Sequence, residues 1–277
     1  MTSGTLASRS ADGVNRSSAF TRYRRTLWLL SARDLKVRYS TSFLGYVWSI
    51  LDPLLMAGIY FVVFTVIFRR DAGEDPYIVF LLVGLLPWTW FNGVISDSTT
   101  AYSKEARLIR STTIPRSIWI ARIVLSKGLE FVFSLPVVVL FIVAAAATGH
   151  PVTLGWGLLL IPAAMVLQAA LAFGLGLLIA PSVVFFRDLE RATKMLLRVG
   201  FYATPIVYGL PDLVGTGLEH WGALNPMSGI IGMYRAGLFP AQLDPIAVGA
   251  SVGITVVVVA VGALVYRRTL RSVLKEL

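Results

Sequence analysis

The sequence predicts an all-α integral membrane protein with six transmembrane helices, an N-terminal amphipathic interface helix, and re-entrant helices between the fifth and sixth spans. Hydrophobic residues make up 56% of the 277 residues and charged residues only 14%, so a soluble fold would lack the polar surface to cover itself. Apolar runs close to the roughly 20 residues that cross a bilayer as a helix recur along the chain. The basic residues gather at the ends of these runs, as in a membrane protein.

Residues 1–19 are rich in Ser, Thr, Arg and Gly and have no apolar core, so we expect a disordered cytoplasmic tail rather than a cleaved signal peptide. Residues 20–44 place basic and apolar side chains on different faces of a helix, which predicts an amphipathic helix on the membrane surface. The alternative is a charged flank that only anchors the next span. The first span follows at 45–68 and begins the six-span domain, 45–266.

Residues 78–95 predict the second span. Trp88, Trp90 and Phe91 follow Pro87 at mid-membrane depth, whereas aromatic belts normally lie at the membrane interfaces. These rings either pack against other helices around a proline kink or face a passage through the membrane. The pattern leaves both interpretations open.

The polar stretch 96–117 predicts a short helix in an aqueous loop, and residues 131–147 complete the third span. Glu130 lies three residues after Lys127 and eight after Arg122, so these side chains can share one helix face and form ion pairs. An unpaired charge at the centre of a span costs about 2.5–3.5 kcal/mol. We therefore expect these charges near the cytoplasmic end of the span or on a surface that faces protein.

Residues 154–179 predict the fourth span, in which Gly174 and Gly176 allow close helix packing. The fifth segment, 195–210, is barely long enough to span. The Gly- and Pro-rich stretch 210–244 contains two short apolar pieces. Such pieces are typical of re-entrant half-helices, which are stable at membrane depth when protein shields them or when they face water.

The last span, 245–266, carries Gly249 and Gly253 in GxxxG spacing, which can pack within one subunit or between two. A basic cytoplasmic tail, 267–277, ends the chain. Six spans place most of the 25 Lys and Arg residues on one side of the membrane. By the positive-inside rule, both termini are then cytoplasmic.

The sequence has neither the GxxxxGK[ST] loop that binds nucleotide phosphates nor the HExxH motif of zinc-dependent hydrolases. It has no Cys, and its two histidines, His150 and His220, are far apart. We therefore expect no catalytic residue, metal or cofactor on this chain. The net charge of +10 is spread over the ends of spans, which argues against nucleic acid as a partner. Asp52 and Asp97 could relay protons in principle, but water or a polar neighbour can satisfy them near the cytoplasmic side.

Five segments carry a resemblance to a known family: RDLKVRYSTSFLGYVWSILDPLL, LIRSTTIPRSIW, FFRDLE, TPIVY and NPMSGIIGMYR. In this order they resemble the signatures of polysaccharide-export ABC transporter permeases, which export O-antigen, teichoic acid and cell-wall galactan. The resemblance extends from Thr21 to the C-terminus, and the Ala-, Val- and Arg-rich composition is most similar to actinobacterial galactan exporter permeases. The family usually has Asn or Glu before the proline of the first span, where this chain has Asp52.

The resemblance implies the transmembrane subunit of an exporter that moves a lipid-linked polysaccharide across the bacterial cytoplasmic membrane. It implies a homodimer docked on two copies of a separate ABC ATPase, which would bind ATP and Mg, with the channel between the two permeases. The re-entrant helices would form the outer gate. The permease of a small-molecule or drug exporter shares this topology and is the main alternative. A membrane enzyme that transfers a lipid-linked sugar is another, but it should show acidic or His clusters at a membrane edge.

Two sets of residues follow from these expectations. The surface helix and the mixed-charge cytoplasmic loops would contact the ATPase through Arg33, Asp34, Lys36, Arg38, Glu105, Arg107, Arg187 and Asp188. A sliding sugar chain needs flat aromatic surfaces that hold its C–H faces weakly, because strong binding would stall it. The aromatic candidates for the substrate channel are Tyr46, Trp48, Tyr60, Phe61, Trp88, Trp90, Phe91, Phe201, Tyr202 and Tyr208. We favour the first and fifth segments as the lining.

Overall fold

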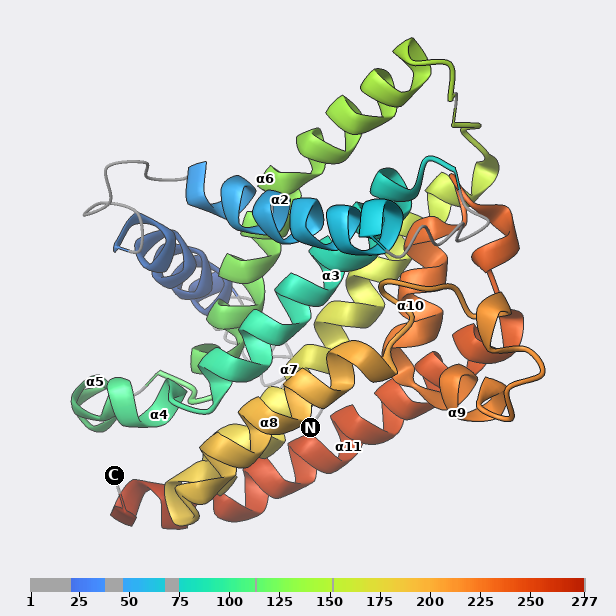
Figure 1. The fold of residues 1–277 in the computed structure, drawn as a ribbon. Helices are drawn as coiled ribbons and strands as arrows, with labels where there is room; N and C mark the ends of the chain where they lie inside the picture. Colours follow the sequence, from blue (N-terminus) through green and yellow to red (C-terminus); the bar gives the residue numbers. More distant parts are fainter. Residues whose placement is uncertain (1–20, 38–46, 68–74, 113, 151, 277) are drawn as a thin grey trace, which may run out of the picture.

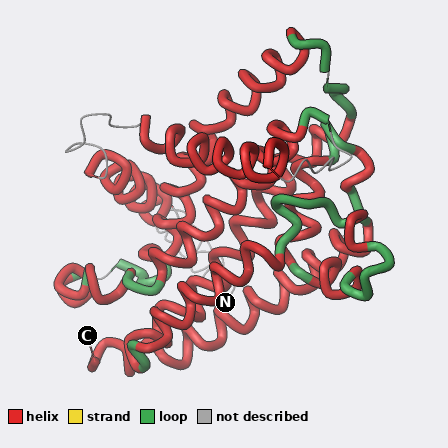
Figure 2. The backbone as a smooth tube through the Cα atoms, in the orientation of Figure 1, coloured by secondary structure: helices red, strands yellow, loops and turns green. Residues whose placement is uncertain are grey.

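The computed structural model describes residues 21–37, 47–67, 75–112, 114–150 and 152–276. Within these ranges the chain forms helices joined by turns and loops, and no strand occurs (Figure 2). The all-α prediction is confirmed for this part of the chain. The tail predicted over 1–19 lies outside the described residues.

The helices are labelled in Figure 1, where a helix over 21–37 comes first without a label. The longer ones are α2 (Trp48–Phe61), α3 (Tyr77–Ser98), α6 (Ile118–Ala147), α7 (Ile161–Phe185), α8 (Asp188–Ala203), α10 (Pro226–Arg235) and α11 (Pro245–Glu276). The shorter ones are α4 (Ala101–Lys104), α5 (Ala106–Ser111), α9 (Glu219–Leu224), the π-helix η2 (Val62–Ile67) and the 3-10 helices η3 (Trp156–Leu160), η4 (Pro211–Leu213) and η5 (Pro240–Gln242).

Several helices are suited to crossing a membrane. Among the described residues, 4 stretches are long and apolar enough: Tyr77–Ser98, Ile118–Ala147, Trp156–Phe185 and Pro245–Thr269. They correspond to the second, third, fourth and sixth predicted spans. The first predicted span is helical over 48–67, because α2 continues directly into η2. α8, which corresponds to the fifth, has 16 residues.

The fifth apolar segment differs from its predicted bounds, 195–210. α8 begins earlier, at Asp188 within the charged sequence FFRDLERATK, and ends at Ala203, before Thr204. Asp188 and Glu190 stabilise its first turn, where the helix dipole favours negative charge. Pro205 disfavours helical backbone at the residue before it, and Thr204 has an extended ψ of 139°. The chain that follows α8 is non-helical and largely buried.

Three other boundaries also differ from the sequence expectation. The charged residues before the third predicted span belong to the same helix as the span, since α6 begins at Ile118 and has 30 residues. The single helix expected within 96–117 is two short helices, α4 and α5, that meet at Glu105. α11 continues to Glu276, so the basic tail predicted over 267–277 is mostly the last part of this helix.

The N-terminal helix, 21–37, lies within the range predicted to form a helix on the membrane surface. Tyr23, Leu27 and Leu30 pack against the core of the bundle, whereas Arg33 is exposed. The apolar face of this helix therefore contacts the protein. Its position at the membrane surface stays a prediction, and residues 38–44 lie outside the described residues.

Small residues allow the long helices to approach closely. A Cβ atom added to Gly174 would lie 2.9 Å from the backbone of Val259 in α11, and one added to Gly176 would lie 2.5 Å from a side chain of α6. The predicted packing role of these two glycines is confirmed. A Cβ on Gly249 or Gly253 would meet nothing within 4 Å, so these two are not packing positions within the subunit.

α3 is the central helix of the bundle. It contacts α2, α6, α7, α8 and α10, and most of its side chains are buried. Figure 1 shows α4 and α5 on one side of the picture, where α3 ends, and α9 and α10 on the opposite side. We call these two sides the α4–α5 end and the α9–α10 end.

Candidate functional site

An open groove of about 330 Å³ lies between α2, α3 and α8. Rings from all three helices line it: Tyr60 from α2, Trp88 from α3, and Phe201 and Tyr202 from α8. We call it the aromatic groove. Its polar lining consists of Thr89, Asn92 and Arg198.

Phe201 is at the centre of the rings that line the groove. Its centroid lies 5.4 Å from that of Tyr60 in a stacked pair, 5.9 Å from Trp88 and 5.1 Å from Tyr202 in edge-to-face pairs. Such pairs stabilise a defined ring arrangement beyond the burial of their area. Trp88 is 6% exposed, whereas Tyr202 is 65% exposed. The groove therefore combines buried rings with an accessible aromatic surface.

The sequence around Phe201 brings α8 close to α3. A Cβ on Gly200 would lie 3.2 Å from the Trp88 ring, so the missing side chain allows this approach. Tyr208, which lies beyond the end of α8, donates a hydrogen bond from its hydroxyl to the carbonyl of Tyr202 at 3.0 Å. Two residues predicted for the channel, Tyr202 and Tyr208, are thus directly linked.

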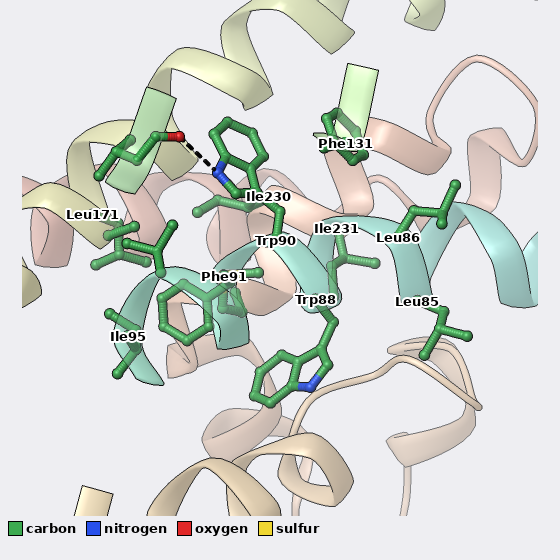
Figure 3. Close-up of a cluster of buried hydrophobic side chains, with 14 of the residues drawn as sticks. Leu85, Leu86, Trp88, Trp90, Phe91, Ile95, Phe131, Leu171, Ile230 and Ile231 are labelled. Atoms are coloured by element: carbon green, nitrogen blue, oxygen red, sulfur yellow. Dashed lines mark hydrogen bonds between the residues drawn. The ribbon is translucent and has the colours of Figure 1, made fainter. Parts of the chain in front are cut away.

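Trp90 and Phe91 lie in the core of the subunit and do not line the groove (Figure 3). Trp90 donates from Nε1 to the carbonyl of Val124 at 3.2 Å and stacks on Phe131 with centroids 5.3 Å apart. Phe91 is 8% exposed. For these two residues the structure favours helix packing, the alternative that the sequence had left open.

The other aromatic candidates lie apart from the groove. Trp48, at the start of α2, is exposed. Phe61 lines a separate cavity of about 380 Å³ with Tyr77 and Phe141. Tyr46 lies outside the described residues.

A charged groove of about 330 Å³ lies at the α4–α5 end, between the N-terminal helix, the end of α3 and α6. At its centre Arg122 pairs with Asp34 of the N-terminal helix and with Glu105 between α4 and α5, both at 3.0 Å. The hydroxyl of Ser31 donates to the carbonyl of Arg122 at 3.3 Å, and the guanidinium lies 4.7 Å from the centroid of the Trp119 ring. One arginine therefore joins three elements, and we call this the Arg122 cluster.

This cluster changes one of the expected ion pairs. Lys127 does pair with Glu130, at 3.3 Å, and it also lies 3.8 Å from Asp97. Arg122, however, binds Asp34 and Glu105 rather than Glu130, because the fold brings the N-terminal helix and the α4–α5 junction against α6. Of the two candidate proton-relay residues, Asp97 lies beside Lys127, which also pairs with Glu130. The side chain of Asp52 lies outside the described part of the structure.

The residues predicted to contact an ATPase fall into two groups. Asp34 and Glu105 are engaged in the Arg122 cluster and are 22% and 20% exposed at the side chain. Arg38 lies outside the described residues. The exposed members are Arg33, Lys36, Arg107, Arg187 and Asp188.

Sequence reasoning missed a second buried arginine, Arg235, at the end of α10. It is 1% exposed, and its guanidinium donates to the carbonyls of Pro205 and Ile206 at 2.7 and 2.6 Å. Gly84 of α3 leaves space for it, because a Cβ there would lie 2.5 Å from the guanidinium. The signal was a lone charge in the apolar stretch NPMSGIIGMYR.

The described residues contain no group of three or more His, Cys, Asp or Glu that could hold a metal ion.

The candidate site consists of two grooves, the aromatic groove and the charged groove, on a bundle of helices. Because several of these helices are candidate membrane spans, the bundle is that of a multi-pass membrane protein. The chain belongs to the ABC-2 type transporter family, whose model matches residues 25–239.

Curated relatives narrow this class. An O-antigen export system permease protein RfbA of Klebsiella pneumoniae is 34% identical over 209 residues, which cover 76% of this chain and 78% of the relative. The protein of the same name from Myxococcus xanthus is 33% identical over 222 residues, 80% and 83% of the two chains. The polysialic acid transport protein KpsM of Escherichia coli is 25% identical over 252 residues, 87% and 92%. These relatives confirm the resemblance to polysaccharide-export permeases.

Proposed function

We propose that this chain is the transmembrane subunit of an ABC exporter that moves a lipid-linked polysaccharide out of the cytoplasm. ATP hydrolysis on a separate nucleotide-binding subunit drives the movement. The aromatic groove between α2, α3 and α8 is the observation that carries the proposal. The O-antigen and polysialic acid transport proteins among the relatives support a polysaccharide as substrate class, and a galactan or teichoic acid chain belongs to the same class.

The chemistry of the groove suits a sugar chain. A sugar ring has hydroxyl edges and apolar C–H faces, so it can lie flat on the rings of Tyr60 and Tyr202 while Thr89 and Asn92 offer hydrogen bonds. Conduction needs sites that bind weakly and repeatedly. A drug exporter would favour an enclosed pocket, whereas this groove is open.

Six spans account for the topology in this proposal. They are 48–67, α3, α6, α7, α8 and α11, with both termini in the cytoplasm because the basic residues gather on that side. α9 and α10 are then re-entrant helices on the outer side. The near-complete burial of α10 supports this assignment, since such helices are stable at membrane depth when protein shields them.

A second copy of the chain would complete the channel. The faces of α2 and α8 beside the aromatic groove expose large apolar side chains: Leu55, Met56, Ile59, Met195, Leu196 and Val199. Two such faces opposite each other would enclose the groove between two subunits in the bacterial cytoplasmic membrane. Two copies of the ATPase, carrying ATP and Mg, would dock at the α4–α5 end through the exposed residues Arg33, Lys36, Arg107, Arg187 and Asp188.

Alanine replacement of Tyr60, Tyr202 and Tyr208 together tests the proposed substrate path. Surface glycan should fall strongly, while the membrane level of the protein and its complex with the ATPase should stay near normal. Trp156→Ala is the matched control, because this ring is 89% exposed and is not part of the groove. Normal surface glycan in the triple variant, or export of small hydrophobic cations at comparable rates, would overturn the proposal in favour of a drug exporter.

Energy coupling has its own test. Purified alone, the chain should hydrolyse no ATP, because the sequence has no phosphate-binding loop. Charge reversal at Arg187 or Asp188 should uncouple transport and leave membrane insertion intact. ATP hydrolysis by the isolated chain at the rate of the complex would contradict a separate ATPase subunit.

A further inference from the structure

The segment 204–208, which follows α8, is non-helical yet buried. Thr204, Ile206 and Val207 are 1%, 0% and 5% exposed. Buried backbone carbonyls need donors, above all in a chain surrounded by lipid, and a non-helical segment cannot supply them from its own helix. The donors here are largely side chains from other elements.

Arg235 of α10 supplies most of these donors. Its Nη1 donates to the carbonyls of Pro205 at 2.7 Å and Tyr208 at 3.3 Å. Its Nη2 donates to the carbonyls of Ile206 at 2.6 Å and Phe80 at 3.2 Å. One guanidinium therefore connects α10, the 204–208 segment and α3.

Two further side chains complete the arrangement. The hydroxyl of Tyr77, at the start of α3, donates to the carbonyl of Val207 at 3.0 Å. Asn225, which caps α10, donates from Nδ2 to the carbonyl of Ala203 at 3.2 Å and lies 2.9 Å from the Thr204 hydroxyl. Side chains of α3 and α10 and the N-cap of α10 thus hold the carbonyls of Ala203, Pro205, Ile206, Val207 and Tyr208.

The position of Arg235 against α3 depends on the shape of that helix. The guanidinium lies 3.5 Å from the centroid of the Phe80 ring, in cation–π contact. A Cβ on Gly84 would lie 2.5 Å from Nη2 and 3.2 Å from the carbonyl of Ile206. A lysine could not replace this group, since it has three donors on one point whereas the guanidinium has five in a fixed plane.

The same segment borders the aromatic groove. Phe201 and Tyr202 precede it on α8, and Leu85 and Trp88 follow Gly84 on α3 within the groove lining. The Tyr208 hydroxyl binds the carbonyl of Tyr202. The arginine and its carbonyls therefore lie at the α9–α10 side of the groove, where a chain would leave it.

We propose that Arg235 is a positioning residue for transport, which holds the 204–208 segment against α3 at Gly84 and so closes the outer end of the aromatic groove. The inference rests on the proposed function, because it assigns the groove to the glycan. Since one side chain holds several carbonyls of the segment, the segment moves away from α3 as a unit when the guanidinium is released.

Chemical accessibility of the segment provides the test. The chain has no Cys, so Val207→Cys introduces a single thiol, and this position contributes its carbonyl rather than its side chain to the hydrogen bonds. Val214→Cys, at a position 74% exposed, is the accessible reference. The rate of reaction with a membrane-impermeant maleimide added from outside is measured on the complete complex with its ATPase. The thiol at 207 should react much more slowly than the thiol at 214.

Variants of the arginine and of Gly84 should then change the rate at 207 alone. Arg235→Gln should raise it about tenfold or more, because several buried carbonyls lose their donor. Arg235→Lys should give an intermediate rate. Gly84→Ala should also raise it, since the added methyl displaces the guanidinium. Gly253→Ala is the matched control and should have no effect, because a Cβ there meets nothing.

The outcomes separate this inference from the function on which it rests. An unchanged rate at 207 in Arg235→Gln and Gly84→Ala, with the complex intact, would overturn the positioning role. Should Arg235→Gln fail to assemble, Gly84→Ala and the milder Tyr77→Phe decide the question by the same rate. A raised rate at 207 in the Arg235→Gln variant, together with no glycan export by the complex that retains Arg235 and Gly84, would leave the role of Arg235 standing and overturn the proposed substrate.

Discussion

Arg122 and Arg235 are both buried in the helix bundle, but different groups hold them. Arg122 pairs with the carboxylates of Asp34 and Glu105 at the α4–α5 end. Arg235 donates to backbone carbonyls at the α9–α10 end. These two ends lie on opposite sides of the bundle (Figure 1).

The two arginines differ in whether their partners can move away from them. Asp34 and Glu105 belong to separate elements and are 22% and 20% exposed, so each can be solvated when its element shifts away from α6. Backbone carbonyls cannot leave Arg235 without displacing the chain itself. The ion-pair end is therefore built for relative motion, which suits the side proposed to receive the ATPase, and the carbonyl end is built to hold one segment fixed.

Replacement of each arginine by alanine should give the largest difference in stability between the two sites. Arg235→Ala removes the donor of four carbonyls, and each buried polar group left without a partner costs about 1–3 kcal/mol. We expect its free energy of unfolding in detergent to fall by about 4 kcal/mol or more. Arg122→Ala should lower it by about 1.5–3 kcal/mol, the scale of a hydrogen bond to a charged group, since water can reach the two carboxylates. An equal loss for both variants would contradict the comparison.

Replacement of each arginine by lysine should give the second-largest difference in stability between the two sites. Arg122→Lys keeps a point charge between two carboxylates and should lose only about 1 kcal/mol of unfolding free energy. Arg235→Lys cannot reach carbonyls that lie in several directions and should lose about 2–3 kcal/mol. The measurement is denaturation of each variant in the same detergent. A lysine tolerated equally well at both positions would show that the plane of the guanidinium is unimportant.

A double-mutant cycle sharpens the assignment of partners. Arg122→Ala combined with Asp34→Ala should be non-additive by about 1–2 kcal/mol, because the two residues are in direct contact. Arg122→Ala combined with Gly84→Ala should be additive within about 0.5 kcal/mol, because Gly84 belongs to the other cluster. Coupling between Arg122 and Gly84 as strong as that between Arg122 and Asp34 would remove the distinction between the two ends.

A change in salt concentration should produce the smallest difference in stability between the two sites. Raising the salt concentration from about 0.1 to 1 M shortens the Debye length from about 10 to 3 Å. The loss of stability caused by Arg122→Ala should then shrink by about 0.5 kcal/mol, because its partners are partly exposed. The loss caused by Arg235→Ala should not change. A salt dependence at Arg235 larger than at Arg122 would contradict the burial of its cluster.

Sequence patterns predicted the elements better than their contacts. The apolar run 78–95 identified α3 closely, because span length and composition are local properties. Spacing along α6 suggested Glu130 as a partner of Arg122, yet its partners Asp34 and Glu105 come from positions 88 and 17 residues away. A helical period cannot reveal such contacts.

The candidate site shows the same limit. The aromatic types and their mid-membrane depth were evident from the sequence, but the rotation of each helix decides whether a ring faces a groove or a neighbour. Trp88 lines the groove and Trp90, two residues on, stacks on Phe131 in the core. Arg235 was overlooked because its role depends on a non-helical segment that Pro205 creates far away in the sequence.

The central claim is that the groove between α2, α3 and α8 carries the glycan chain, and site-directed photocrosslinking tests it directly. Tyr202→Cys and Val166→Cys each give the cysteine-free chain one exposed thiol, at positions 65% and 71% exposed. The first lies in the groove and the second on a separate apolar surface between α7 and α11. Each is coupled to a benzophenone maleimide, assembled with the ATPase and irradiated during export. We predict a glycan adduct at position 202 and none at 166. An active complex with no adduct at 202, or with equal adducts at both positions, would contradict the account.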